Sequence, residues 1–170
     1  SDVLFIGSDL TFKRKFNNMF NSSLTLNYLW SNNLDNNGKL INQPPVRIEK
    51  NLTFKTNKFW KVNFSEISLM PSYTFRQFNS PIVISPESLI DGSANINSNS
   101  NIFDFKEAPV GYFLLDFSWK LQVSDFEVSL IVNNILNKEY RNYLNSMRYF
   151  ADDIGRNFII NLSYHFKKKN

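Results

Sequence analysis

The chain has 170 residues, of which 42% are hydrophobic and 20% are charged. This balance is too apolar for a disordered chain and too polar for a helical membrane protein, and no stretch approaches the roughly 18 consecutive apolar residues of a transmembrane helix. The formal net charge of +4 is mild and its basic residues are scattered, which gives little support to nucleic-acid binding. Because there is no cysteine, disulfides, thiolate metal sites and cysteine nucleophiles are excluded.

Seven segments alternate between apolar and polar residues, with the period of two that predicts β-strands. In chain order they are 4–13, 22–30, 46–56, 59–75, 111–123, 126–134 and 157–166. In the fourth segment the apolar phase slips after Phe64, which predicts a β-bulge near Ser65 and Glu66. Any crossing of a membrane would therefore be made by strands.

The predicted connections alternate between short and long. The short turns are 16–21, 57–58 and 124–125, and the long loops are 35–45, 76–110 and 141–156. Short turns at one end and long loops at the other are typical of bacterial outer-membrane barrels. The predicted fold class is thus all-β, an antiparallel transmembrane β-barrel segment with about seven strands.

The alternation alone fits a soluble sandwich as well as a barrel wall, so other features must separate the two. Several segments reach the nine to eleven residues, roughly, of a tilted membrane strand. Aromatic residues lie near strand ends, as in an aromatic girdle, at Trp30, Trp60, Trp119, Tyr112 and Tyr164. Lys50 is an exception, since it falls on the predicted lipid face. Polar residues expected to face the barrel interior are Asp116, Lys120, Glu127, Ser129 and Asn161.

The stretch NKEYRNYLNSMRYFADDIGRNF, before the last strand, holds the candidate site. We expect no catalysis, because its adjacent aspartates would point in different directions and no histidine or cysteine accompanies them. The favoured interpretation is a stiffened loop in which Arg148 or Arg156 pairs with these two aspartates and Gly155 supplies a turn conformation. The loop-structuring residues are then Asp152, Asp153, Gly155 and Arg156. The alternative is direct binding of an anionic or aromatic ligand by Arg141, Tyr143, Arg148 and Tyr149.

No metal site, cofactor or enzymatic activity is expected. His165 is the only histidine, and a single histidine does not build a zinc site without partners.

Positions 111 to 166 closely resemble the C-terminal end of TonB-dependent outer-membrane receptors, particularly those of Bacteroidota. The resemblance rests on a glycine–aromatic strand start after a Pro-containing loop (EAPVGYFLLDFSW), on the segment VNNILNKEY, and on a loop that reads NYLN, RYFAD and GRN before a last strand ending in an aromatic residue.

The resemblance implies an outer-membrane barrel of about 22 strands in a Gram-negative bacterium. Residues 1–166 would form its C-terminal part and 167–170 a basic tail. The receptor would import a scarce nutrient such as an iron-siderophore or haem, with energy delivered by TonB through a plug domain that this chain does not show. Tyr164 and Phe166 would be the C-terminal signal for the barrel-assembly machinery, although the family usually stops at the aromatic residue.

Two alternatives remain open from the residues. One is a split or oligomeric outer-membrane barrel that acts as an adhesin or assembly subunit, in which other chains satisfy the open strand edges. The other is a soluble β-barrel or sandwich that binds a hydrophobic ligand and is released from membranes without detergent.

Overall fold

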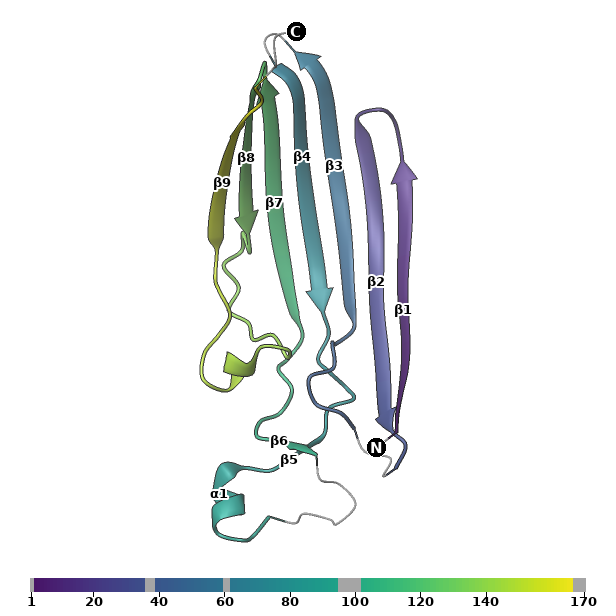
Figure 1. Ribbon diagram of the computed structural model, residues 1–170, viewed down its shortest axis with the longest axis vertical. Coiled ribbons are helices and arrows are strands. Elements are labelled where there is room, and N and C mark those ends of the chain that lie inside the picture. The colour runs from purple at the N-terminus through teal and green to yellow at the C-terminus, as the bar shows by residue number, and fades with distance from the viewer. Residues whose placement is uncertain (1, 36–38, 60–61, 95–101, 167–170) are drawn as a thin grey trace.

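The computed structural model describes residues 2–35, 39–59, 62–94 and 102–166. Seven long strands form one antiparallel sheet in the order β1-β2-β3-β4-β7-β8-β9 (Figure 1). Their bounds are β1 Val3–Lys15, β2 Phe20–Asn33, β3 Arg47–Phe59, β4 Val62–Thr74, β7 Tyr112–Val123, β8 Phe126–Asn133 and β9 Asn157–Tyr164. Between β4 and β7 lie β5 (Ile82–Val83), α1 (Pro86–Ile90) and β6 (Phe103–Asp104), and the 3-10 helix η1 (Ser146–Tyr149) precedes β9.

All seven predicted strands are confirmed, with ends that differ by a few residues. The largest difference is the predicted turn at 57–58, which lies inside β3, because β3 continues to Phe59 and β4 begins at Val62. The strand β3 therefore extends three residues beyond the end of the predicted segment at position 56. Trp60, one of the predicted girdle residues, lies outside the described residues.

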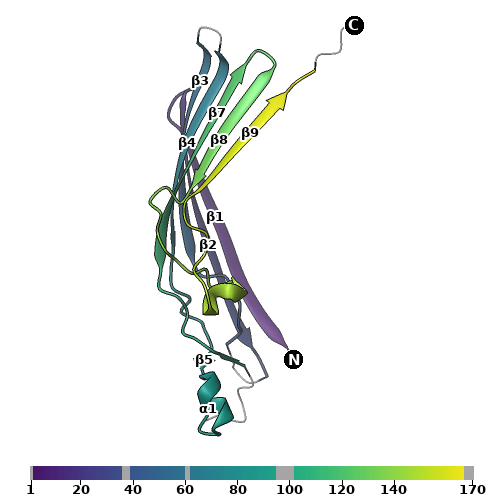
Figure 2. The same cartoon turned by 90° about the vertical axis from the view of Figure 1, so that its left-hand side faces the viewer.

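The two ends of the sheet differ as the sequence predicted. The short turns lie at one end and the three long connections, 34–46, 75–111 and 134–156, lie at the other (Figure 1). Seen from the side, the sheet is curved, and η1 lies on its concave side (Figure 2). No helix in the described part of the chain is long and apolar enough to cross a membrane.

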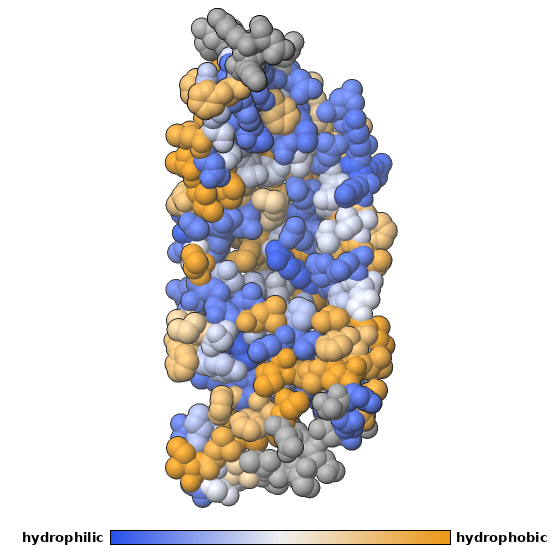
Figure 3. All heavy atoms as spheres, in the orientation of Figure 1, coloured by the Kyte–Doolittle hydropathy of each residue, from blue (hydrophilic) through white to orange (hydrophobic). Residues whose placement is uncertain are grey.

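The strand register places apolar side chains together on one face of the sheet, which we call the apolar face. Representative members from successive strands are Leu10, Leu26, Ile48, Leu69, Phe117, Leu130 and Ile160. The predicted interior residues Asp116, Lys120, Glu127, Ser129 and Asn161 share the opposite face, which we call the polar face. Hydrophilic residues fill much of the strand region in Figure 3, and hydrophobic ones gather near the loop end.

The predicted bulge near Ser65 and Glu66 is wrong. Phe64 pairs with Asn57 and Ile67 with Phe54, so the register between β3 and β4 is unbroken across this segment. The apparent slip of phase arises because Phe64 lies on the polar face, opposite Gln122 of β7.

The aromatic residues divide between the two faces. Trp30, Trp119 and Tyr164 lie on the apolar face, as expected for a girdle. Tyr112 does not, because it is paired with Thr74 on the polar face and is buried there. Lys50 lies on the apolar face opposite Leu24, as predicted.

The sheet has no second layer among the residues that the structure describes. The buried hydrophobic side chains are Ile84, Ala108, Tyr112 and Tyr143, all at the loop end. In contrast, Leu162 and Ile160 on the apolar face of β9 are 75% and 67% exposed. A soluble sandwich buries such a face against another sheet about 10 Å away, and this chain leaves it uncovered.

Candidate ligand-facing loop site

Three connections fold against one another at the loop end. The Gln77 side chain donates from Nε2 to the carbonyl of Gln43 at 2.9 Å, and the Asn79 side chain donates to the carbonyl of Ser31 at 2.7 Å. Both side chains are buried. Because buried amides without partners are costly, these bonds fix the 75–111 connection against its neighbours.

The centre of this region is an ion pair between Arg148 and Asp104. Arg148 Nη2 donates to Asp104 Oδ2 at 2.5 Å, and the two side chains are only 2% and 1% exposed. The Tyr149 hydroxyl donates to the second carboxylate oxygen, Oδ1, at 2.6 Å, and accepts from Arg148 Nη2 at 2.8 Å. We call Asp104, Tyr143, Arg148 and Tyr149 the loop core.

Aromatic rings enclose the guanidinium group. Arg148 Cζ lies 4.5 Å from the ring centroid of Tyr143 and 4.3 Å from that of Tyr149. Such contacts contribute about 2 kcal/mol when desolvated. Asn145 begins η1 by accepting from the backbone N–H of Met147 at 2.9 Å, so the short helix brings Arg148 and Tyr149 to Asp104.

The electrostatics of the loop core follow from this geometry. Burial opposes ionisation of Asp104, but hydrogen bonds from Tyr149 and Arg148 and the charge of Arg148 outweigh it and lower the pKa of the carboxyl. Burial, together with the bond to Asp104, raises the pKa of Tyr149 to about 12. Burial also raises the pKa of Tyr143.

The loop core should therefore loosen at both extremes of pH. The depressed pKa of Asp104 means that its contribution is complete above about pH 4, the ordinary value, and is lost as the pH falls through the folded-state value. Tyr149 contributes fully below about pH 10 and loses its contribution towards pH 12. A spin label at Met147 should become mobile in both ranges. An Asp104→Asn variant that keeps the acid transition would contradict this assignment.

The predicted partners of the two adjacent aspartates are wrong. Asp152 pairs with Arg141 Nε at 2.6 Å rather than with Arg148 or Arg156. Asp153 accepts from the backbone N–H of Asn142 at 2.6 Å and from the Asn145 side chain at 2.9 Å. Arg148 pairs instead with Asp104, which is distant in sequence, so the local pattern of charges did not predict this pairing.

Gly155 does not adopt a left-handed conformation, contrary to the prediction, since Gly92 is the glycine with positive φ among the described residues. The constraint at Gly155 is close approach: an added Cβ would lie 2.9 Å from Asn137 Oδ1, which accepts from the backbone N–H of Arg156 at 3.0 Å.

Two pockets lie among the long connections at the loop end. One, of about 350 Å³, is lined by residues on both sides of the β7 start and by the 138–141 segment, including Val110, Tyr140, Arg141 and Asp152. The other, of about 520 Å³, is apolar and is lined by Leu40, Ile41, Gln43, Ile102, Phe103 and Phe105. The smaller pocket combines apolar walls with the cation of Arg141, which suits a small organic ligand.

The four predicted ligand residues separate into two groups. Tyr143 and Arg148 are buried, at 2% and 3% exposure, and hold the loop core together. Arg141 lines the smaller pocket, and Tyr149 is half-buried. Direct ligand contact therefore remains a prediction for Arg141 and Tyr149.

The prediction did not include Asp104 and Lys106. Lys106 Nζ donates to the carbonyl of Tyr149 at 2.6 Å, so both residues join the 75–111 connection to η1. No periodicity marks them in the sequence. Within the described ranges, no group of three or more His, Cys, Asp or Glu residues is arranged to hold a metal ion.

Comparisons with known proteins give one kind of match. No protein family and no curated protein sequence matches the chain. Among solved structures, the fold is similar to part of the copper transporter OprC, with a TM-score of 0.73 and 15% identity over 96% of this chain. The chain spans 23% of the length of that transporter. At this identity the likeness shows a shared transporter-like fold and nothing about cargo.

Proposed function

We propose that this chain is part of the barrel wall and extracellular loops of an outer-membrane TonB-dependent transporter. The observation that carries the proposal is the single-layer antiparallel sheet with one exposed apolar face and one polar face. Lipid would cover the apolar face, as it does in outer-membrane barrels. The fold shared with a transporter and the resemblance of residues 111–166 support the same assignment.

The orientation follows from the loops. Long loops are extracellular and short turns are periplasmic in outer-membrane barrels. The loop core and the two pockets would then meet the medium, while the polar face would line the barrel interior. We propose that the cargo is a scarce nutrient carried as a small molecule, such as an iron-siderophore or haem, and that TonB acts through a plug domain.

A membrane location is favoured over the soluble binding module by the uncovered apolar face. A soluble barrel would turn its apolar residues inward. In this sheet Tyr112 and Asp116 of the polar face contact the 134–156 loop. Figure 2 shows that loop on the concave side, so the polar face is the concave one.

Ligand contact is tested with two arginines of the same loop. Arg141→Ala in the full-length protein should weaken uptake at least tenfold, because a charge-assisted hydrogen bond contributes about 1.5–3 kcal/mol. Arg156→Ala should leave uptake within about twofold, since its exposed side chain does not line either pocket. The measurement is growth of a deletion strain on a ferric siderophore, haem or Cu²⁺ as the limiting source. Equal uptake by both variants would remove Arg141 from the ligand site.

Failure of the complemented strain to differ from the deletion strain on every nutrient would contradict the transport proposal itself. The two outcomes are distinct, because the first compares variants and the second compares presence with absence of the protein.

A further inference from the structure

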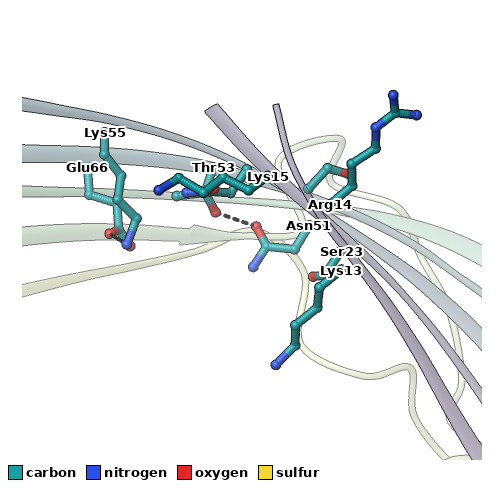
Figure 4. A pocket seen from close by; sticks show the side chains of 10 residues that line it. Lys13, Arg14, Lys15, Ser23, Asn51, Thr53, Lys55 and Glu66 are labelled. Atoms are coloured by element: carbon teal, nitrogen blue, oxygen red, sulfur yellow. Dashed lines mark hydrogen bonds and ion pairs between the residues drawn. The ribbon is translucent and has the colours of Figure 1, made fainter. Parts of the chain in front are cut away.

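We propose that the polar face binds a small oxyanion, a phosphate or carboxylate group, in a pocket near the short-turn end of β1, β2 and β3. This pocket has a volume of about 550 Å³ (Figure 4) and lies at the end of the sheet opposite the long loops (Figure 1). The proposal does not depend on transport, since it concerns binding by this wall alone.

Two lysines give the pocket its charge. Lys13 pairs with Ser23 and Lys15 with Asn21 in the register of β1 with β2, which places both lysines on the polar face. Both are exposed, and within the described chain no carboxylate lies within ion-pair distance of either. The third lysine of the pocket, Lys55, is neutralised by Glu66 at 2.6 Å. On the polar face the pocket therefore keeps the charges of Lys13 and Lys15 beyond the Lys55–Glu66 pair.

The nearby carboxylates of the polar face are already engaged. Asp9 accepts from the Asn27 side chain at 2.7 Å, and Glu49 pairs with Arg47 at 2.8 Å. Further along the sheet, Glu127 pairs with Lys120 at 2.9 Å. Since these acids have their own partners, Lys13 and Lys15 are the cations on this face for which the described chain supplies no counter-charge.

Neutral donors lie in the same pocket as the two lysines. Asn21, Ser23 and Asn51 line the pocket with amide and hydroxyl groups. The Thr53 hydroxyl donates to Asn51 Oδ1 at 3.0 Å, which leaves the amide nitrogen as the donor end of the Asn51 side chain. Ammonium, amide and hydroxyl donors together match the several acceptor oxygens of a phosphate or a carboxylate.

Arg14 also lines the pocket, but its charged group lies on the other side of the strand. It carries the same charge as its two neighbours but lies on the apolar face, where its guanidinium group lies 4.8 Å from the Phe16 ring centroid. Figure 4 shows its side chain pointing away from Lys13 and Lys15.

The test measures binding of inorganic phosphate and of succinate to the full-length protein in detergent at low ionic strength. Lys13→Gln with Lys15→Gln should weaken binding at least about tenfold, and Lys13→Arg with Lys15→Arg should preserve it. Lys120→Gln, which removes a lysine charge from the same face outside the pocket, should leave affinity within about twofold, and added salt should weaken binding to the wild type.

The two probes distinguish the sources of the oxyanion. Binding of phosphate alone supports a phosphate ligand, binding of succinate alone supports a carboxylate, and binding of both supports recognition of the shared group. Absence of binding by the wild-type protein, or equal affinity of wild type and the double glutamine variant, would overturn the proposal. Thermal melting of each variant verifies that the lysine changes leave the fold intact.

Discussion

Replacing Arg148 with alanine is expected to lower the local stability of the loop core by about 3–5 kcal/mol. The change would leave Asp104 buried at 1% exposure without its ion-pair partner, and an uncompensated buried charge costs about that much. It would also remove the cation from between Tyr143 and Tyr149. Backbone amides of η1 should lose their hydrogen-exchange protection, while those of β7 and β8 keep theirs.

Arg141→Ala is the matched control for stability. Its bridge to Asp152 is 2.6 Å long but more than a third exposed on both sides, and exposed pairs contribute about 0–1 kcal/mol. Its contact with η1 is one hydrogen bond to the Arg148 carbonyl at 3.0 Å. If Arg148→Ala changed exchange in η1 no more than Arg141→Ala does, the loop core would not be the element that holds the three connections together.

Leu26→Arg should destabilise the full-length protein in lipid vesicles by about 2–4 kcal/mol, the cost of a cation near the middle of a lipid-facing strand. Leu26 lies between Leu10 and Ile48 on the apolar face. Its neighbour Thr25 lies on the polar face, opposite Glu49, so Thr25→Arg places the same charge one residue away on that face, beside the Arg47–Glu49 ion pair.

Urea unfolding of both variants checks this prediction. Thr25→Arg should remain within about 1 kcal/mol of the wild type. The reverse order, with Thr25→Arg the more destabilised, would mean that the polar face is the buried one and that the membrane assignment is wrong.

The strands were predictable because each carries its own evidence. Alternation along a strand reports a two-sided environment, and it located β7, β8 and β9 closely. The prediction was wrong at Phe64, which is an apolar residue on the polar face. Alternation does not distinguish the two faces of a strand where both carry apolar residues. Tyr112 was assigned to the wrong face for a related reason, because a shift of one residue along a strand moves a side chain to the other face.

The loop site was predictable in its location but not in its pairing. The concentration of Arg, Tyr and Asp in residues 137–158 indicated the segment that holds η1 and most of the loop core. The partner of Arg148 lies 44 residues earlier, in an Asn- and Ser-rich connection with no periodic signal. The prediction therefore paired Arg148 with the carboxylates nearest to it in the sequence. In the structure Arg148 pairs with Asp104, and both side chains are buried.

The central claim is that the apolar face contacts lipid and the polar face does not. Since the chain has no cysteine, a single spin label can be attached at Leu26→Cys or Thr25→Cys in the protein within isolated outer membranes. We predict that the label at 26 is reached by oxygen dissolved in the bilayer and is protected from a water-soluble nickel reagent, with the opposite result at 25. Equal access of the nickel reagent to both positions, or recovery of the protein without detergent, would contradict the account.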